Sequence, residues 1–152
     1  MRLTMKSPRT GALVFLPFVL AFGCARKPEQ AAPNYKDVIV TLELQHDGKL
    51  MPIPDFKNLK LSKNADDRAH WKYCGDGDLN ISMKPGSDND PFEPGNWEHS
   101  NANHCTDVRS PKISPNAREK KFGQPYNPYK YTITVTGVLN TVPNDPDIEI
   151  MQ

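Results

Sequence analysis

The sequence lacks an excess of charge of either sign, with 19 Lys and Arg against 18 Asp and Glu. Because nucleic-acid-binding domains carry a basic patch that neutralises phosphates, this balance excludes a strong nucleic-acid interface. Short catalytic motifs are also missing: the chain has no Gly-x-Ser-x-Gly, no phosphate-binding loop and no His-Glu-x-x-His. We therefore expect a protein that is not an enzyme and that carries no cofactor.

Long helical patterns are absent after Cys24, and 15 prolines are spread along the chain. Proline is excluded from helix interiors and from central strands, so the elements must be short. Short stretches instead alternate between apolar and polar residues, with turn residues between them. These stretches are Val38–Leu44, Leu59–Leu61, Ala69–Tyr73, Leu79–Met83, Tyr129–Val135 and Asp147–Ile150. The pattern predicts an all-β fold of the sandwich or barrel type.

Residues 84–128 break this pattern and form one long Pro-rich segment. Structureless loops of such length are uncommon inside compact domains, so we expect it to hold a few short strands or a helical turn. Its expected apolar anchors are Phe92, Trp97, Val108, Ile113 and Phe122.

The N-terminus has the order of an export signal. Arg2, Lys6 and Arg9 precede an apolar run over 11–23, which is too short to span a bilayer comfortably and suits a signal-peptide core. Gly23 directly before Cys24 resembles a lipobox, in which the Cys thiol is acylated and becomes the new N-terminus. The sequence thus predicts a bacterial lipoprotein signal peptide over 1–23, lipidation at Cys24, a tether over 24–34 and one domain over 35–152. An ordinary signal peptide with an incidental Cys24 is the alternative.

This interpretation places the protein in the cell envelope, anchored to a membrane by lipid. Ala25 rather than Asp after the Cys resembles the outer-membrane sorting signal, where two membranes are present. Cys74 and Cys105 then remain as an even number in an oxidising compartment, which favours a disulfide between them. The alternative is that both are free thiols or metal ligands.

The C-terminal part of the chain resembles a known family. Pro128-Tyr129-Lys130-Tyr131-Thr132-Ile133, followed by Asp145-Pro146-Asp147-Ile148-Glu149-Ile150, is similar to the closing hairpin of cupredoxin-like domains, and the Trp71 segment resembles their second long strand. The resemblance implies a Greek-key β-sandwich. The copper ligands do not carry over, because residues 136–144 contain no Cys, His or Met. A blue-copper centre needs a thiolate and two imidazoles, so we expect the fold without that centre.

Other site patterns are weak. His70, His99 and His104 offer a non-standard copper or zinc site, although zinc sites have tighter paired spacings. Asp76–Asn80 resembles the start of a calcium loop but has Ile81 where such loops need Gly. Trp97, Tyr126 and Tyr129 could form an exposed aromatic platform, or act as core and loop anchors.

Two function classes follow. The first is a monomeric, membrane-anchored, non-enzymatic envelope domain that binds an unknown protein or envelope component or has a structural role. The second is a metal-binding periplasmic or surface protein that uses copper or zinc at the three histidines.

Overall fold

The computed structural model describes residues 32–84, 90–95 and 97–152, and these residues form an all-β fold without helices. The strands are β1 (Asn34–Leu44), β2 (Leu50–Pro54), β3 (Asn58–Ser62), β4 (Asp67–Cys74), β5 (Asp78–Met83), β6 (Glu98–Ala102), β7 (Cys105–Arg109), β8 (Tyr129–Thr136) and β9 (Asp147–Met151). The predicted signal peptide and Cys24 lie outside the described residues. Within those residues, no helix has the length and apolar character needed to cross a membrane.

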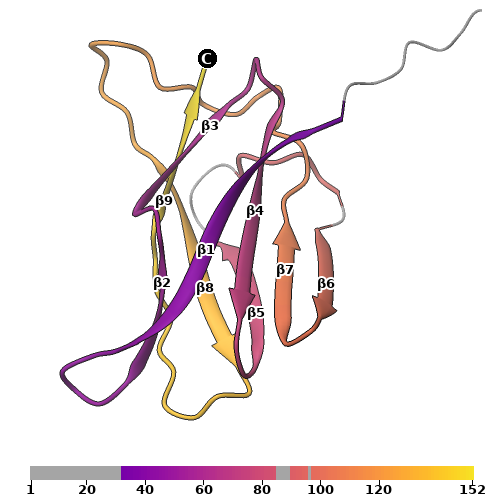
Figure 1. The fold of residues 1–152 in the computed structure, drawn as a ribbon. Helices are drawn as coiled ribbons and strands as arrows, with labels where there is room; N and C mark the ends of the chain where they lie inside the picture. The colour runs from indigo at the N-terminus through magenta and orange to yellow at the C-terminus, as the bar shows by residue number, and fades with distance from the viewer. Residues whose placement is uncertain (1–31, 85–89, 96) are drawn as a thin grey trace, which may run out of the picture. The chain divides into compact units, whose positions relative to one another are not determined.

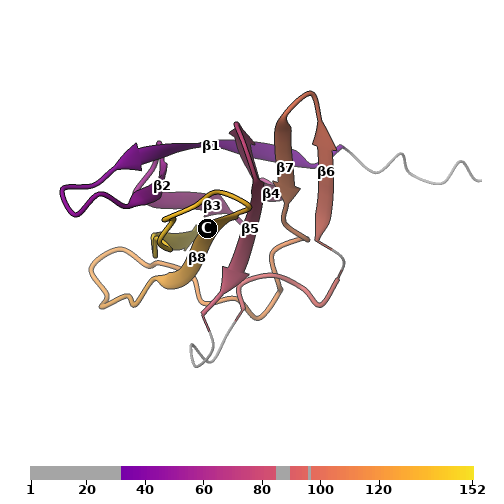
Figure 2. The same ribbon diagram turned by 90° about the horizontal axis from the view of Figure 1, so that it is seen from below.

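The strands form two mixed sheets that pack face to face as a sandwich (Figure 1, Figure 2). The first sheet has the order β2-β1-β4-β7-β6, and the second has the order β3-β9-β8-β5. The β1–β4 and β3–β9 pairs are parallel, and every other pair within the two sheets is antiparallel. The prediction of an all-β sandwich is therefore confirmed.

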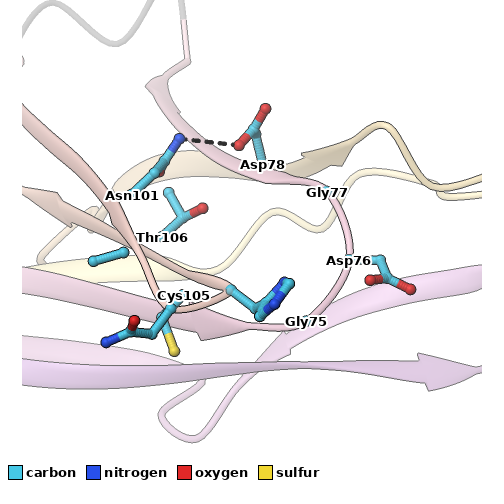
Figure 3. Close-up of a pocket in the computed structure, with 10 residues that line it drawn as sticks. Gly75, Asp76, Gly77, Asp78, Asn101, Cys105 and Thr106 are labelled. Carbon is cyan, nitrogen blue, oxygen red and sulfur yellow. Dashed lines mark hydrogen bonds between the residues drawn. The ribbon is translucent and has the colours of Figure 1, made fainter.

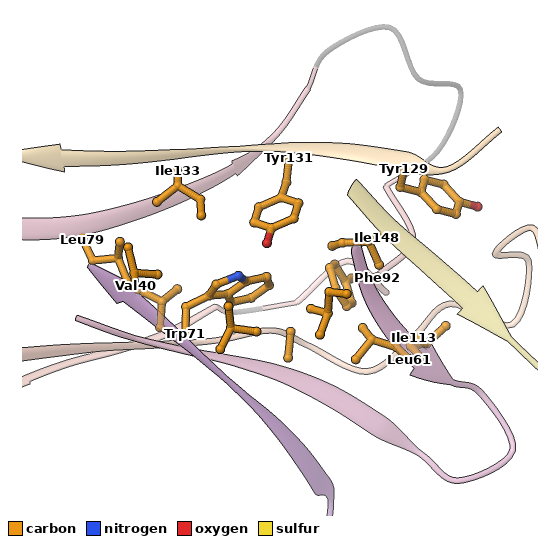
Figure 4. Close-up of a cluster of buried hydrophobic side chains, with 14 of the residues drawn as sticks. Val40, Leu61, Trp71, Leu79, Phe92, Ile113, Tyr129, Tyr131, Ile133 and Ile148 are labelled. Carbon is orange, nitrogen blue, oxygen red and sulfur yellow. The ribbon is translucent and has the colours of Figure 1, made fainter. Parts of the chain in front are cut away.

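The core lies between the sheets and follows from the alternation in the sequence. In β4, Ala69, Trp71 and Tyr73 are buried toward the second sheet, and in β8, Tyr131, Ile133 and Val135 face them. Trp71 and Tyr131 meet at the centre, with ring centroids 5.4 Å apart (Figure 4). Burial raises the pKa of the Tyr131 hydroxyl to about 12, so this group stays protonated at neutral pH.

The prolines of β2 sit where an edge strand tolerates them. Pro52 and Pro54 lie opposite Leu42 and Val40 of β1. The Asp55 N–H donates to the Ile39 carbonyl, so the odd-numbered residues are the ones whose backbone groups form hydrogen bonds between β1 and β2. The nitrogens of both prolines therefore face away from β1, where no hydrogen bond is lost. The two prolines therefore lie in an edge strand of the first sheet.

The long Pro-rich segment contains two short strands, β6 and β7, as expected. Phe92 and Ile113 are buried and bridge one another, and Val108 is fully buried. The expectation that Phe122 is an apolar anchor is wrong, because its side chain is fully exposed. Hydrophobicity alone cannot distinguish an anchor from an exposed loop tip, since the backbone around Phe122 decides where the ring points.

Candidate functional site

A largely apolar depression of about 660 Å³ lies between the two sheets at one side of the sandwich. We call it the β1–β3 groove. It is lined by Tyr35, Lys36, Asp37, Phe56, Asn58, Leu59 and Lys60. One wall is the first half of β1 in the first sheet, and the other wall is β3 in the second sheet. The groove therefore lies between strands of two different sheets.

The β1 wall is an unpaired strand edge. β2 pairs only with Val40–Leu44, whereas β4 covers the opposite edge from Asn34 to Val40. Asp55 exchanges hydrogen bonds with Ile39, which shows that the odd-numbered backbone groups point to the β2 side. By strand alternation, the N–H and C=O groups of Tyr35 and Asp37 point the same way, and no described strand pairs with them there.

The β3 wall is open in the same manner. β9 pairs with one edge of β3. The Lys57 C=O and the Lys63 N–H, just before and after β3, form backbone hydrogen bonds with Asp147 and Met151. The odd-numbered residues of β3 therefore direct their backbone groups toward β9. The backbone groups of Asn58 and Lys60 therefore face away from β9. The next such position, Ser62, donates its N–H to Asp67 Oδ2 at 2.9 Å, so a side chain closes this edge at its end.

The groove combines apolar surface with a positive charge excess. Phe56 is half exposed at its mouth and Leu59 is buried beneath it. Lys36 and Lys60 are exposed on the two walls. Asp37 is already engaged, because Lys72 Nζ lies 2.8 Å from its Oδ2. Lys36 is also engaged, because its Nζ lies 3.8 Å from Asp67 Oδ2. The groove thus presents the ammonium groups of Lys60 and of the paired Lys36, with one carboxylate that is paired with Lys72.

His70 forms a polar cluster on the outer face of the first sheet, beside the groove. Its Nδ1 lies 2.9 Å from Asp37 Oδ1 and its Nε2 lies 3.0 Å from Asp107 Oδ1. Ionised carboxylates only accept hydrogen bonds, so a ring nitrogen that carries a hydrogen donates it to the carboxylate beside it. Lys72, and then His70, hold the pKa of Asp37 below its usual value against the opposing effect of burial.

This cluster joins three strands, β1, β4 and β7, and it extends to Tyr35. The Tyr35 ring contacts His70 edge-on at 5.8 Å, and the Arg109 guanidinium lies 5.5 Å from the Tyr35 ring centre. Both ring nitrogens of His70 are occupied by carboxylates, so neither is left to ligate a metal or to activate a nucleophile.

The structure does not bring the three candidate histidines together. His70 faces outward from β4, whereas His99 pairs with Val108 and shares the inner side of the sheet with that core residue. His104 lies in the two-residue turn between β6 and β7, with a positive φ of 59°. Among the described residues, no three His, Cys, Asp or Glu side chains are grouped so as to hold a metal ion.

Cys74 and Cys105 form the predicted disulfide. They are directly opposite each other on β4 and β7, with Cα atoms 4.0 Å apart, the close spacing of a non-hydrogen-bonded antiparallel pair. The bond tethers the Pro-rich segment to the sheet, at the end where the β4–β5 loop meets the β6–β7 turn.

A small polar depression of about 300 Å³ lies at this end (Figure 3). Asp78 accepts a hydrogen bond from Asn101 Nδ2 at 3.1 Å, while the carboxylate of Asp76 projects away from it. The residues that resembled a calcium loop thus build a turn, in which Gly77 adopts a φ of 93° and a Cβ would collide with the Thr136 carbonyl.

Of the three aromatics considered for an exposed platform, each has a structural contact. Trp97 stacks on Trp71 with ring centroids 5.7 Å apart. Tyr129 is fully buried, and its hydroxyl accepts a hydrogen bond from the Arg118 backbone at 2.6 Å. The Tyr126 hydroxyl accepts one from Ile150 at 3.0 Å. These residues are anchors.

The groove residues were missed by sequence reasoning. The available signal was Phe56, an aromatic between two polar residues just before a short strand, but nothing local shows which strand edges stay unpaired. In comparisons with known proteins, the chain matches no family model, no curated protein and no solved structure.

Proposed function

We propose that the chain is a membrane-tethered binding domain of the bacterial cell envelope that takes up an extended segment of a partner protein in the β1–β3 groove. The observation that supports this function is the pair of unpaired strand edges, at Tyr35 and Asp37 on β1 and at Asn58 and Lys60 on β3, on the two sides of one groove. Exposed edges of this kind bind extended peptides by adding a strand.

The bound segment adds a strand to β3. Asn58 and Lys60 together offer two N–H and two C=O groups, and each hydrogen bond formed contributes about 1 kcal/mol net. Alternate side chains of the segment pack on Phe56 and the Tyr35 ring, which supply the apolar contact that backbone pairing alone lacks. Specificity comes from these pockets rather than from the backbone.

The charges of the groove select the partner. Lys60 and Lys36 line the two walls, Lys36 lies 3.8 Å from Asp67, and Asp37 is paired with Lys72. An extended segment with alternating apolar residues and at least one Asp or Glu complements this lining. Charge complementarity of this kind favours fast association and rejects basic segments.

The same proposal includes the location and the finer fold. Lipidation at Cys24 anchors the domain, and the Cys74–Cys105 disulfide is consistent with an oxidising compartment. The parallel β1–β4 pair and the terminal β8–β9 hairpin support a cupredoxin-like, Greek-key arrangement, which agrees with the family resemblance of the Trp71 and Tyr129 segments.

Peptide selection tests the binding function. The full chain in detergent is used to select from a displayed library of ten-residue peptides, and the enriched peptides are measured by titration calorimetry. We expect the enriched peptides to be extended and to contain alternating apolar residues with an Asp or Glu. They should bind the variants Lys60→Pro and Phe56→Ser about five- to tenfold more weakly than the parent chain, since each variant loses about 1 kcal/mol of contact. Lys60→Pro removes both the outward N–H and the ammonium of Lys60, at an edge-strand position that tolerates proline.

Leu139→Ser is the matched control, because Leu139 is 87 % exposed and remote from the groove. Unchanged binding is expected for this variant. Equal binding by all three variants, or no enrichment above an unrelated β-sandwich, would overturn the groove as the binding site.

A further inference from the structure

Phe122 is the most exposed large apolar side chain of the described residues, at 106 % relative exposure. It lies in the long connection between β7 and β8, at the end of the sandwich where β1 begins and β9 ends (Figure 1). A single exposed apolar side chain is common on protein surfaces, so the ring indicates a contact only together with its surroundings.

The loop that carries Phe122 is fastened to the sandwich on both sides. Lys120 Nζ contacts both carboxylate oxygens of Glu149 at 2.7 and 2.8 Å, and the Lys120 N–H bonds to the Ile150 carbonyl at 2.7 Å. Gln124 then bonds back to the Lys121 carbonyl, and Gly123 adopts a φ of 71°. This turn projects Phe122 outward.

The surroundings of Phe122 are basic. The segment from Lys112 to Gln124 contains Lys112, Arg118, Lys120 and Lys121 against the single acidic Glu119. The other strongly exposed apolar loop residue, Leu139, lies in residues 137–144, which carry no charge. Within the described part of the chain, the combination of a fully exposed ring with adjacent cations is thus found in this loop alone.

The β7–β8 loop shares one end of the sandwich with the incoming chain, although the two lie on opposite sides of it (Figure 1, Figure 2). The described chain enters β1 at Asn34, at the same end of the sandwich as the β7–β8 loop (Figure 1). The ten steps from Cys24 to Asn34 span at most roughly 35 Å when fully extended. A domain held by so short a tether keeps this end within reach of the anchoring membrane.

We infer that the Lys121–Phe122 tip docks the domain onto an anionic lipid surface. The Phe122 ring enters the boundary between headgroups and acyl chains, and Lys121 contacts lipid phosphates, as basic and aromatic residues do at membrane interfaces. Docking would fix the orientation of the domain, which a flexible tether alone leaves free. The inference rests on the proposed membrane attachment and adds to it a defined contact surface.

Depth-dependent quenching tests the docking. The full chain carrying Phe122→Trp is reconstituted with vesicles of phosphatidylcholine and phosphatidylglycerol that contain brominated acyl chains, with the unsubstituted chain as the spectral reference. We expect the introduced indole to be quenched and its emission to shift to shorter wavelength. Both effects should be lost in pure phosphatidylcholine, at high salt and with Lys121→Glu, because the attraction to anionic lipid is then weakened.

Leu139→Trp in the same vesicles is the matched control, since Leu139 is exposed in an uncharged loop, and we expect no quenching there. Equal quenching at the two positions, or quenching at position 139 alone, would overturn the docking surface. If the chain sediments with vesicles but the indole at position 122 is not quenched, the Lys121–Phe122 docking contact is refuted and the membrane attachment stands. If the chain does not sediment with vesicles, both the docking contact and the membrane attachment are refuted.

Discussion

Lys120 Nζ contacts both carboxylate oxygens of Glu149, at 2.7 and 2.8 Å, and joins the β7–β8 loop to the last strand. The Glu149 side chain is only 8 % exposed, whereas that of Lys120 is 40 % exposed. The pair therefore lies at the boundary between core and solvent, and Lys120, as the largest influence, holds the pKa of Glu149 below its usual value.

We predict that Lys120→Met lowers the free energy of unfolding by about 1–3 kcal/mol, because it leaves a nearly buried carboxylate without its donor. Urea denaturation measures this loss. Lys49→Met is the control: Lys49 and Asp47 are 2.9 Å apart but more than half exposed, so that change should leave the free energy of unfolding nearly unchanged. Equal losses for the two variants would show that the Lys120–Glu149 contact does not hold the loop.

The domain should lose stability in acid. Lys72 lowers the pKa of Asp37, Lys84 that of Asp145 and Lys120 that of Glu149, from ordinary values of 3.8, 3.8 and 4.5. A carboxyl whose folded pKa is lowered stabilises the fold above its ordinary pKa, and this contribution disappears as the pH falls through the folded pKa. Unfolding free energy should thus be level near neutral pH and fall below about pH 4.5.

Burial raises the pKa of the Asp90 carboxyl. Protonation of this group therefore favours the folded state, and its contribution to stability increases as the pH falls. Urea melts between about pH 6 and pH 3 measure the balance. A free energy of unfolding that increases as the pH falls over that range would contradict the prediction that the three paired carboxylates dominate the pH dependence.

Cys74 and Cys105 are 31 residues apart in sequence. In the chain-entropy model, a disulfide that closes a loop of this size contributes roughly 3–4 kcal/mol. We expect the double variant Cys74→Ala with Cys105→Ala to lose about that much, and the β6–β7 hairpin to exchange its amide hydrogens faster than β1. Two titratable thiols in the denatured, unreduced domain would contradict the bond.

His70 should matter for stability rather than for chemistry. His70→Leu leaves Asp37 and Asp107 without their shared donor on the outer face of the sheet, which we expect to cost about 1–3 kcal/mol. His99→Leu is the control, because His99 is exposed on an edge strand, and it should be within about 0.5 kcal/mol of the parent. A His70→Leu variant as stable as the parent would show that the carboxylates do not depend on the ring.

Lipidation at Cys24 is the prediction that decides the location. Mass spectrometry of the mature N-terminus should find a diacylglyceryl mass on Cys24, since two or more acyl chains give stable anchoring where one is marginal. Cys24→Ser should release the protein from the membrane fraction. A variant that fractionates like the parent, or a mature chain cut elsewhere, would refute the anchor.

Local patterns in the sequence determined much of this protein. Alternation in Ala69–Tyr73 and Tyr129–Val135 fixed which side chains enter the core, because successive residues of a strand point to opposite faces. The even number of cysteines that remains once Cys24 is set aside correctly indicated the Cys74–Cys105 bond, and the prolines of residues 51–55 restricted that stretch to an edge strand or a loop. These inferences depend only on neighbours along the chain.

Tertiary structure alone decided the rest. Asp37, His70 and Asp107 meet because β4 lies between β1 and β7, and no spacing in the sequence encodes that order. The β1–β3 groove exists because β2 covers only half of β1 and β9 covers only one edge of β3. Alternation specifies the face of a residue but not the neighbour of its strand. The unpaired edges and the outward Phe122 therefore became visible only once the strands were placed.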